Sequence, residues 1–283
     1  MRIIDSLDDI ADRYDALFCD VWGVVHNGRA PFAPAVAALQ RFREKGGRVL
    51  LLTNVPKPRD PIPGHLDRIG VARDAWDAIV TSGDAIRAEL AKRAPGPMLK
   101  IGPPHDAILW DGLGLAQSEL ADAKFIAISG LNRDGEETPE DYLPLLREAR
   151  TRDMELLCAN PDLVVRFGDK LYPCAGAIAL EYEKLGGRVV MAGKPFQPIY
   201  DLAFEELNRI AGRAIAHDRI LAIGDSAATD VKGANGAGLD CLFVADGIHG
   251  AALMTGGVLD PTKADVALAK EGVRADYAMP GLA

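Results

Sequence analysis

The chain has 283 residues, of which 48% are hydrophobic and 26% charged, with a net charge of −9 at pH 7. This composition is ordinary for a folded protein with a substantial core, and the length suits two domains or one large one. Nucleic-acid backbones and anionic membrane surfaces are bound through basic patches, so the acidic balance argues against both partners.

The N-terminal segment, MRIIDSLDDIADRY, carries acids early and has no apolar run flanked by basic residues, so it does not resemble a signal peptide. No run approaches the ~20 apolar residues that span a bilayer. Cys19, Cys158, Cys174 and Cys241 are scattered without CxxC spacing, which is typical of buried thiols rather than of disulfides or a zinc site. We therefore expect a cytoplasmic protein without a membrane segment.

Short apolar runs alternate with longer amphipathic segments along the chain. Runs that are apolar throughout indicate strands buried on both faces. The expected strands are 16–19, 49–53, 78–81, 125–129, 155–158, 188–191, 220–223 and 241–244. The expected helices are 33–47, 142–152, 177–187 and 198–212. Strand–helix alternation at this spacing predicts an α/β fold with a parallel sheet covered on both faces.

Two segments are spelled alike, FREKGGRVLLLTN (42–54) and YEKLGGRVVMAGKP (182–195). We expect the same helix–glycine–strand arrangement in both, because Gly commonly ends a helix. Between them, the proline-rich stretch VPKPRDPIPGH (55–65) predicts a loop that could gate a site.

Polar side chains follow several of the expected strands. Asp20 follows the first strand, Thr53–Asn54 the second and Lys194 a later one, while Asp225 and Asp230 follow 220–223. Each residue alone is more often a cap or a turn residue. Together they are informative, because ligands of doubly wound sheets bind at the carboxyl ends of the strands. The most specific segment is GDSAATD, in which two acids flank small residues directly after an apolar strand.

These residue types suit phosphoryl transfer. A carboxylate such as Asp20 can attack phosphorus and hold the group as an acyl phosphate. The hydroxyl of Thr53 can hydrogen-bond the phosphoryl oxygens, and Lys194 can neutralise charge that develops on them. Asp20, Asp225 and Asp230 supply the hard oxygen ligands that Mg²⁺ prefers, and the metal would reduce the repulsion between nucleophile and phosphate. We expect these groups to converge on one divalent cation.

The order DxxGV, LLTN, GKP and GDSxxTD, over residues 20–230, resembles the haloacid dehalogenase superfamily. Segments such as IVTSGDA (79–85), ANPD (159–162) and GDSAATDVKGANGAGLDCLFVADG (224–247) are similar to its NagD-like, class IIA branch. The resemblance implies a Rossmann-like, doubly wound parallel-sheet core formed by residues 1–81 and 188–283. It also implies an α/β cap inserted at residues 82–187.

The same resemblance implies residue roles. Asp20 would be the nucleophile and a metal ligand, with Thr53 and Lys194 as catalytic phosphoryl-binding residues. The backbone carbonyl of Trp22, Asp225 and Asp230 would complete the Mg²⁺ site. In the cap, Asn160 and Asp162 would lie near the leaving group of a small phosphorylated metabolite. From their places in the sequence, at the first two strand ends and the loop after Asp20, we also expect Trp22, His26 and Asn54 to contact the substrate. Caps of this family often take part in dimers, so a homodimer is compatible with the resemblance, and the identity of the substrate is not spelled by any motif.

Trp22 departs from the family pattern. The family's phosphatases carry an Asp at this position, which protonates the leaving oxygen and then activates water. Indole can do neither, and the loss of a general acid–base group costs about 10²–10⁴ in rate. We therefore expect a Mg²⁺-dependent phosphatase of weak turnover. Trp22 could also have a purely structural role, in which it packs under the cap and excludes water.

Three functions remain open on the sequence. A phosphatase could use a substitute proton carrier, for which the loop histidine His26 is nearest, although a plainer interpretation is a histidine hydrogen-bonded to the backbone. The pocket could instead serve a phosphometabolite-binding or regulatory protein that has lost turnover. A dehalogenase, which also carries an aromatic residue at this position, ranks last because such enzymes do without Mg²⁺ and would not use Asp225 and Asp230.

Overall fold

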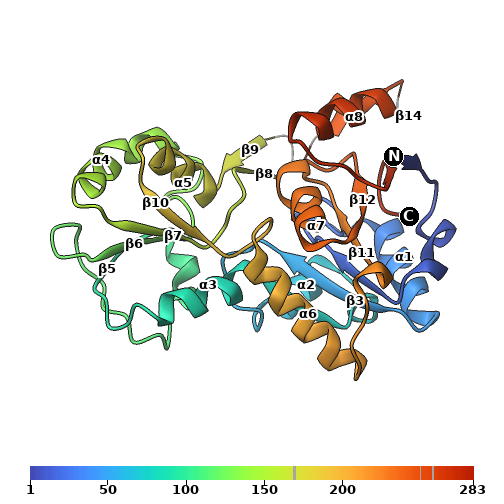
Figure 1. Cartoon of the computed structure of the whole chain (residues 1–283), viewed down its shortest axis with the longest axis horizontal. Helices are drawn as coiled ribbons and strands as arrows, with labels where there is room; N and C mark the ends of the chain where they lie inside the picture. Colours follow the sequence, from blue (N-terminus) through green and yellow to red (C-terminus); the bar gives the residue numbers. More distant parts are fainter. Residues whose placement is uncertain (168–169, 249, 257) are drawn as a thin grey trace. The chain divides into compact units, whose positions relative to one another are not determined.

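The computed structural model describes residues 1–167, 170–248, 250–256 and 258–283. The chain forms two compact units (Figure 1). The first unit contains Met1–Thr53, Asp60–Val80 and Lys194–Ala283, and the second contains Asn54–Arg59 and Thr81–Gly193. Thr53 is therefore the last residue of the first unit before the chain first enters the second, and Lys194 is the first residue after the chain finally returns.

The first unit is built on a seven-stranded sheet with the order β1-β15-β12-β11-β2-β3-β4. Its strands are β1 (Arg2–Ile3), β2 (Ala16–Cys19), β3 (Arg48–Thr53), β4 (Ala78–Thr81), β11 (Ile220–Gly224), β12 (Asp240–Val244) and β15 (Tyr277–Met279). The pairs β1–β15, β15–β12, β12–β11, β11–β2 and β2–β3 are all parallel. All residues of β2 and β11 are buried, as their unbroken apolar sequences predict.

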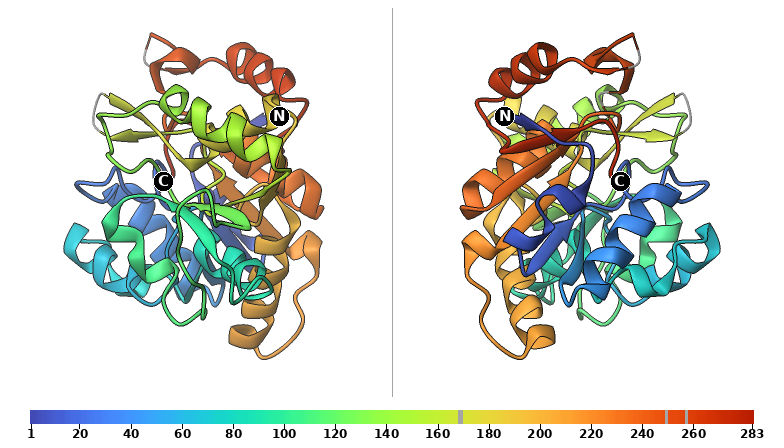
Figure 2. Two further views of the ribbon diagram at one scale, coloured as in Figure 1. Left: turned by 90° about the vertical axis from the view of Figure 1, so that its left-hand side faces the viewer. Right: turned by 90° about the vertical axis from the view of Figure 1, so that its right-hand side faces the viewer.

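Helices cover both faces of this sheet. They are α1 (Ala33–Glu44), α2 (Ile62–Ile69), α6 (Gln197–Ala211), α7 (Lys232–Ala237) and α8 (Pro261–Lys270). The same unit contains a small antiparallel pair of strands, β13 (Met254–Thr255) and β14 (Val258–Leu259). The chain moves from β2 to β3 in one direction and from β11 to β12 in the other, so right-handed crossovers place the connecting helices on opposite faces. Figure 2 shows the blue α1 and the orange α7 on opposite sides of the sheet.

The second unit has its own parallel sheet, with the order β10-β7-β6-β5. Its elements are α3 (Ser82–Ala91), β5 (Met98–Ile101), β6 (Phe125–Ile128), α4 (Leu143–Thr151), β7 (Glu155–Cys158), the hairpin β8 (Val164–Phe167) and β9 (Lys170–Pro173), α5 (Ala175–Lys184) and β10 (Arg188–Met191). A buried cluster that includes Ile126, Leu156 and Tyr182 forms its core. The sequence boundary at residue 188 needs a correction, because β10 pairs with β7 and belongs to this unit.

The two similarly spelled segments form the same structure in their respective units. In the first, Gly46 has φ +92° after α1, and in the second, Gly186 has φ +78° after α5. The next glycine in each case lies under a ring, since a Cβ on Gly47 would come within 2.2 Å of Phe42 and one on Gly187 within 2.4 Å of Tyr182. The repeat therefore comes from one way of turning a helix tightly into a strand.

Each expected strand and helix is present within a few residues of its predicted bounds. The loop prediction for 55–65 is wrong at its end, because α2 begins at Ile62. Proline is tolerated in the first turn of a helix, where its missing N–H has no partner to lose, and Pro63 occupies that turn. The four cysteines are buried and free of disulfides, as expected. Within the described ranges we find no helix that is both long and apolar enough to cross a bilayer.

Candidate active site

The strand order of the first unit reverses between β2 and β11. From this central pair, β3 and β4 lie on one side and β12, β15 and β1 on the other. Cys19 is in register with Ile223, and the Asp20 N–H donates to the Ile223 carbonyl at 2.8 Å. Asp20 and the segment that starts at Gly224 therefore leave the sheet side by side. In open α/β sheets, such a reversal is where ligands bind.

Three carboxylates meet at this point. Asp20, Asp225 and Asp230 each offer an oxygen, and these oxygens lie within 4.8 Å of one another with all three residues buried. Asp230 comes from a single π-helical turn, Ala227–Val231, an irregularity that is frequent at functional sites. The expected convergence of the three acids is therefore present.

Backbone amides hold two of these acids in place. Ser226 N–H donates to Asp230 Oδ2 at 3.1 Å, and Ile248 N–H donates to Asp225 Oδ2 at 2.7 Å. Burial raises the pKa of Asp225 well above its usual value, and the charges of Asp20 and Asp230 raise that pKa further. A buried carboxyl among other carboxyls is costly as an anion, so the cluster favours a bound cation.

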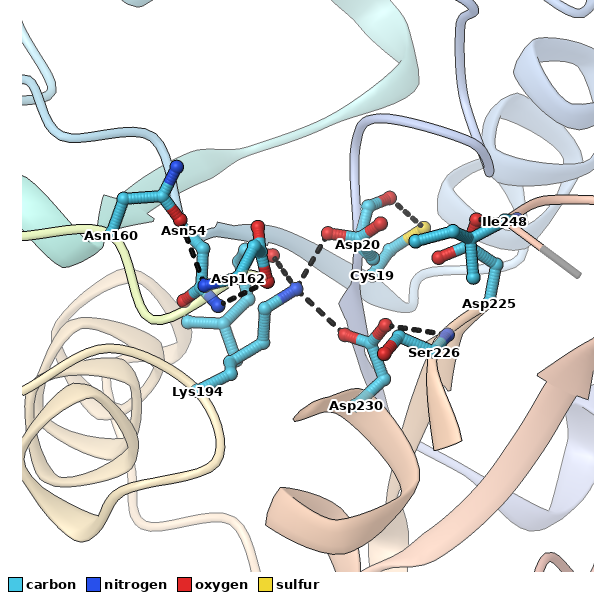
Figure 3. Close-up of polar contacts among 11 residues, drawn as sticks. Cys19, Asp20, Asn54, Asn160, Asp162, Lys194, Asp225, Ser226, Asp230 and Ile248 are labelled. Carbon is cyan, nitrogen blue, oxygen red and sulfur yellow. Dashed lines mark hydrogen bonds and ion pairs between the residues drawn. The ribbon is translucent and has the colours of Figure 1, made fainter. Parts of the chain in front are cut away.

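Lys194 supplies positive charge inside the cluster. Its Nζ donates to Asp20 Oδ1 at 2.5 Å, to Asp230 Oδ1 at 2.7 Å and to the Leu52 carbonyl at 3.0 Å (Figure 3). These are three acceptors for the three hydrogens of one ammonium group, and the residue is only 3% exposed. One ammonium does not balance three ionised carboxylates, so a divalent ion with a preference for oxygen, such as Mg²⁺, fits the donor set.

Gly23 brings the loop after Asp20 against the acids. It has φ +87°, and a Cβ on it would lie 2.1 Å from Asp225 Oδ2. Both the left-handed conformation and the close approach require glycine here. The Gly in the DxxGV pattern is therefore explained by packing against an acid that lies about two hundred residues later in the chain, as Asp225 follows Gly23 by 202 positions.

The remaining predicted residues fall into two groups. Thr53 ends β3 in the first unit and is 8% exposed. Asn54, the next residue, belongs to the second unit, where its Nδ2 donates to Asp162 Oδ1 at 2.8 Å. Asp162 N–H in turn donates to Asn160 Oδ1 at 3.1 Å. Asn54, Asn160 and Asp162 therefore form one hydrogen-bonded group within the second unit (Figure 3).

The loop residues Trp22 and His26 contact each other. Their rings meet edge to face with centroids 5.2 Å apart, and Trp22 is half-buried. His26 is 2% exposed, and its Nδ1 accepts a hydrogen bond from Gly28 N–H at 2.9 Å. Burial, with a smaller effect of His65, lowers the pKa of His26 to about 4. This environment agrees with the plainer interpretation of His26, a histidine bonded to the backbone.

The sequence did not identify every group that builds the site. The Leu52 carbonyl and the N–H groups of Ser226 and Ile248 bind the charged side chains, but backbone groups carry no signal in the residue letters. Gly247 is different, because a Cβ there would lie 2.0 Å from Asp225 Oδ2. The glycine after the strand that follows GDSAATD is a signal that could have found this contact.

Two family models match the chain. A model described as haloacid dehalogenase-like hydrolase matches residues 17–116, and one described as HAD-hydrolase-like matches residues 191–270. The first range contains Asp20 and Thr53, and the second contains Lys194, Asp225 and Asp230.

Individual relatives agree with these models. The chain is 43% identical to the crystal structure of a haloacid dehalogenase-like family hydrolase from Brucella suis 1330, covering 99% of this chain and 100% of that one with a TM-score of 0.89. It is 27% identical to glycerol phosphate phosphatase from Mycobacterium tuberculosis in complex with magnesium, covering 95% and 76% of the two chains with a TM-score of 0.65. It is 25% identical to the ribonucleotide monophosphatase NagD of Escherichia coli K12, over 82% of this chain and 88% of that protein.

Proposed function

The chain belongs to the haloacid dehalogenase-like hydrolases, in their NagD-like class IIA branch, and from this membership we propose that it is a Mg²⁺-dependent phosphatase of a small phosphorylated metabolite that acts through an aspartyl phosphate. The observation that carries the proposal is the buried cluster of Asp20, Asp225 and Asp230 with Lys194. Two of the relatives are phosphatases by name, and one of these is a magnesium complex.

In the proposed reaction, Asp20 is the nucleophile. Its carboxylate attacks phosphorus, and the phosphoryl group passes from the substrate oxygen to the carboxylate oxygen. Lys194 holds Asp20 Oδ1 at 2.5 Å, which orients the carboxylate and places positive charge beside the phosphoryl oxygens. Thr53, at the end of the neighbouring strand β3, is the proposed hydroxyl donor to the same oxygens. Asn54, Asn160 and Asp162 stay proposed substrate contacts.

Asp20, Asp225, Asp230 and the backbone carbonyl of Trp22 would hold the Mg²⁺. When bound, the ion reduces the repulsion between the carboxylate nucleophile and the anionic phosphate. The three buried carboxylates fit this group because all are hard oxygen ligands and their oxygens lie within 4.8 Å of one another. The same acids have no role in a dehalogenase that works without metal, so we do not carry that function further.

Trp22 favours a second candidate function. With indole in place of the acid–base carboxyl, the site could bind a phosphorylated metabolite without turning it over.

The division of the chain into a core and an inserted cap stays our proposal, and so do a homodimer and a cytoplasmic location. Gel filtration with light scattering checks the oligomeric state.

The test of the phosphatase is phosphate release from a panel of sugar phosphates, nucleotides, small phosphoesters and acetyl phosphate with Mg²⁺. Asp20→Asn is the matched control, because the amide keeps the shape of the side chain and loses the nucleophile. We expect release by the wild type and none above background by Asp20→Asn. Equal release by both proteins would remove the covalent mechanism. An inert wild type that still binds inorganic phosphate with Mg²⁺, measured by calorimetry, would support the binding protein.

A further inference from the structure

The loop that follows Asp20 is a closed turn. Val25 N–H donates to the Val21 carbonyl at 2.8 Å, and Gly23 N–H donates to the His26 carbonyl at 2.8 Å. Within the same turn, the side chains of Trp22 and His26 also contact each other, edge to face. The indole therefore occupies a defined position two residues after the nucleophile, and an indole N–H is a donor that does not give up its proton at neutral pH.

Several polar groups of the first unit around Asp20 are already engaged. All three hydrogens of Lys194 are donated to Asp20, Asp230 and the Leu52 carbonyl. Asp230 accepts through both oxygens, from Lys194 and from Ser226 N–H. The Nδ1 of His26 accepts from Gly28 N–H, and its ring contacts those of Trp22 and His65. To protonate a leaving group, Lys194 or Asp230 would have to give up one of these contacts, and His26 would have to donate from Nε2 of a ring that is only 2% exposed.

From this arrangement we propose, resting on the phosphatase function above, that the site selects phosphorylated substrates whose leaving group departs as an anion without receiving a proton. That class comprises acyl phosphates, phosphoanhydrides and aryl phosphates of acidic phenols. Phosphate esters of ordinary alcohols are excluded, because an alkoxide is a poor leaving group at neutral pH unless an acid protonates it as the bond breaks.

The first step balances without an acid. The Asp20 carboxylate forms a bond to phosphorus, the bond from phosphorus to the leaving oxygen breaks, and its electron pair stays on that oxygen as an anion. The products are phospho-Asp20 and the free anion, which takes a proton from water after departure. Charge is stabilised on the leaving group itself, so the rate of this step depends directly on how acidic the conjugate acid of that group is.

The second step has no general base at position 22. Water attacks phosphorus, the bond between the Asp20 oxygen and phosphorus breaks, and its electrons return to the carboxylate. Both protons of the water leave with the product as dihydrogen phosphate. This step is the same for every substrate, and without a base it is slow, so phospho-Asp20 accumulates whenever the first step is fast. We therefore expect a burst of leaving group equal to about one per protein chain, followed by slow turnover.

The test uses the wild-type protein with Mg²⁺ and a graded series of substrates: acetyl phosphate, substituted phenyl phosphates and glycerol phosphate. We expect the single-turnover rate to rise with leaving-group acidity, approaching about tenfold per pKa unit, the limit at which full charge develops on the departing oxygen. Mass spectrometry after mixing with acetyl phosphate should find one phosphoryl group on Asp20. Glycerol phosphate turned over as fast as 4-nitrophenyl phosphate would overturn the proposal, because an acid would then be acting.

Two variants separate the missing acid from the bulk of the indole. Trp22→Asp places a carboxyl at this position. Trp22→Asn introduces a side chain of nearly the same size as Asp but without the acid. We expect Trp22→Asp to raise the rate on glycerol phosphate by about 10²–10⁴ and to flatten the dependence on leaving-group acidity. Trp22→Asn should do neither. Equal gains in both variants would mean that the indole acts only by occupying space, and the proposal would fail.

Failure of this inference differs from failure of the phosphatase itself. If the wild type is inert on the whole series and Trp22→Asp hydrolyses glycerol phosphate, the phosphatase site is intact and only the substrate class is wrong. If the wild type and Trp22→Asp are both inert and Asp20 is never phosphorylated by acetyl phosphate, the proposed function fails as well. Because the series on the wild type needs no variant, a misfolded Trp22→Asp protein would leave the main test unaffected.

Discussion

The two parallel sheets of this chain differ in strand order and in what their carboxyl ends carry. The seven-stranded sheet reverses its order between β2 and β11, and buried Asp20, Asp225 and Lys194 meet there. The four-stranded sheet runs in simple chain order, β5, β6, β7 and β10, and its strand β7 leads to partly exposed Asn160 and Asp162. At a reversal the crossovers leave to opposite faces and open a crevice, whereas sequential order opens none. The charged chemistry lies at the reversal.

The largest expected effect compares one carboxylate from each sheet. We expect Asp20→Asn to reduce phosphatase activity on the order of 10⁴-fold or more, as the loss of a nucleophile does. Asp162→Asn removes a charge but keeps an oxygen that can accept the hydrogen bond from Asn54, so we expect a change of at most about tenfold. The measurement is kcat/KM for both variants on the best substrate of the panel. Similar losses in both would abolish the distinction between the two sheets.

Stability offers the next contrast. Lys194 lies between two buried carboxylates, so Lys194→Met leaves them unpaired, and we expect a loss of about 3–5 kcal/mol in the free energy of unfolding. Arg59 pairs with Asp84 in the second unit at 2.8 Å but is a third exposed, so Arg59→Met should cost at most about 1 kcal/mol. Urea denaturation without Mg²⁺ measures both. If Arg59→Met lowers the free energy of unfolding as much as Lys194→Met, burial does not explain the larger contribution expected of Lys194.

Magnesium should stabilise the protein through the carboxylates of the seven-stranded sheet only. With Mg²⁺ at about a hundredfold excess over its dissociation constant, we expect the wild type to gain about 2.7 kcal/mol in the free energy of unfolding. Asp225→Asn should not gain, because it removes one of the three carboxylates. Without Mg²⁺ this variant should be at least as stable as the wild type, because it relieves repulsion among buried acids. Thermal unfolding of both proteins, with and without Mg²⁺, checks this prediction. An equal gain in stability for the wild type and Asp225→Asn would count against a metal at this site.

The smallest effect concerns His26, the buried neutral ring in the loop after Asp20. Its pKa of about 4 lies below the unfolded value of 6.5, so between these values the unfolded chain binds a proton that the folded chain does not. Stability contributed by neutral His26 is therefore present above pH 6.5 and is lost as the pH falls toward 4. Relative to His26→Gln, we expect the wild type to lose about 1–3 kcal/mol over this interval. Urea denaturation at several pH values tests it, and a constant difference between the two proteins would show that His26 is not held neutral by burial.

The candidate site was largely readable from local patterns. Asp20, Thr53, Lys194, Asp225 and Asp230 were each identified by an apolar strand before a polar residue, and all of these residues lie where such strands end or shortly after. Period and composition are local properties, so they predict elements and the chemistry of their ends. The same patterns missed β5 and α3 and placed β10 in the wrong unit, because a short apolar run does not specify the strand with which it pairs.

By itself, the sequence determined that this is an α/β chain with acids, a hydroxyl and a lysine at strand ends. Its resemblance to the haloacid dehalogenase superfamily showed that Trp22 stands where the family's phosphatases carry an acid–base carboxyl. Only the tertiary structure decided that Lys194, 174 residues from Asp20, lies between two carboxylates, and that the Nδ1 of His26 is engaged by the backbone. The reason is physical. Burial, pairing and pKa depend on which distant residues share a small volume, and that depends on the order of the strands rather than on any one stretch of letters.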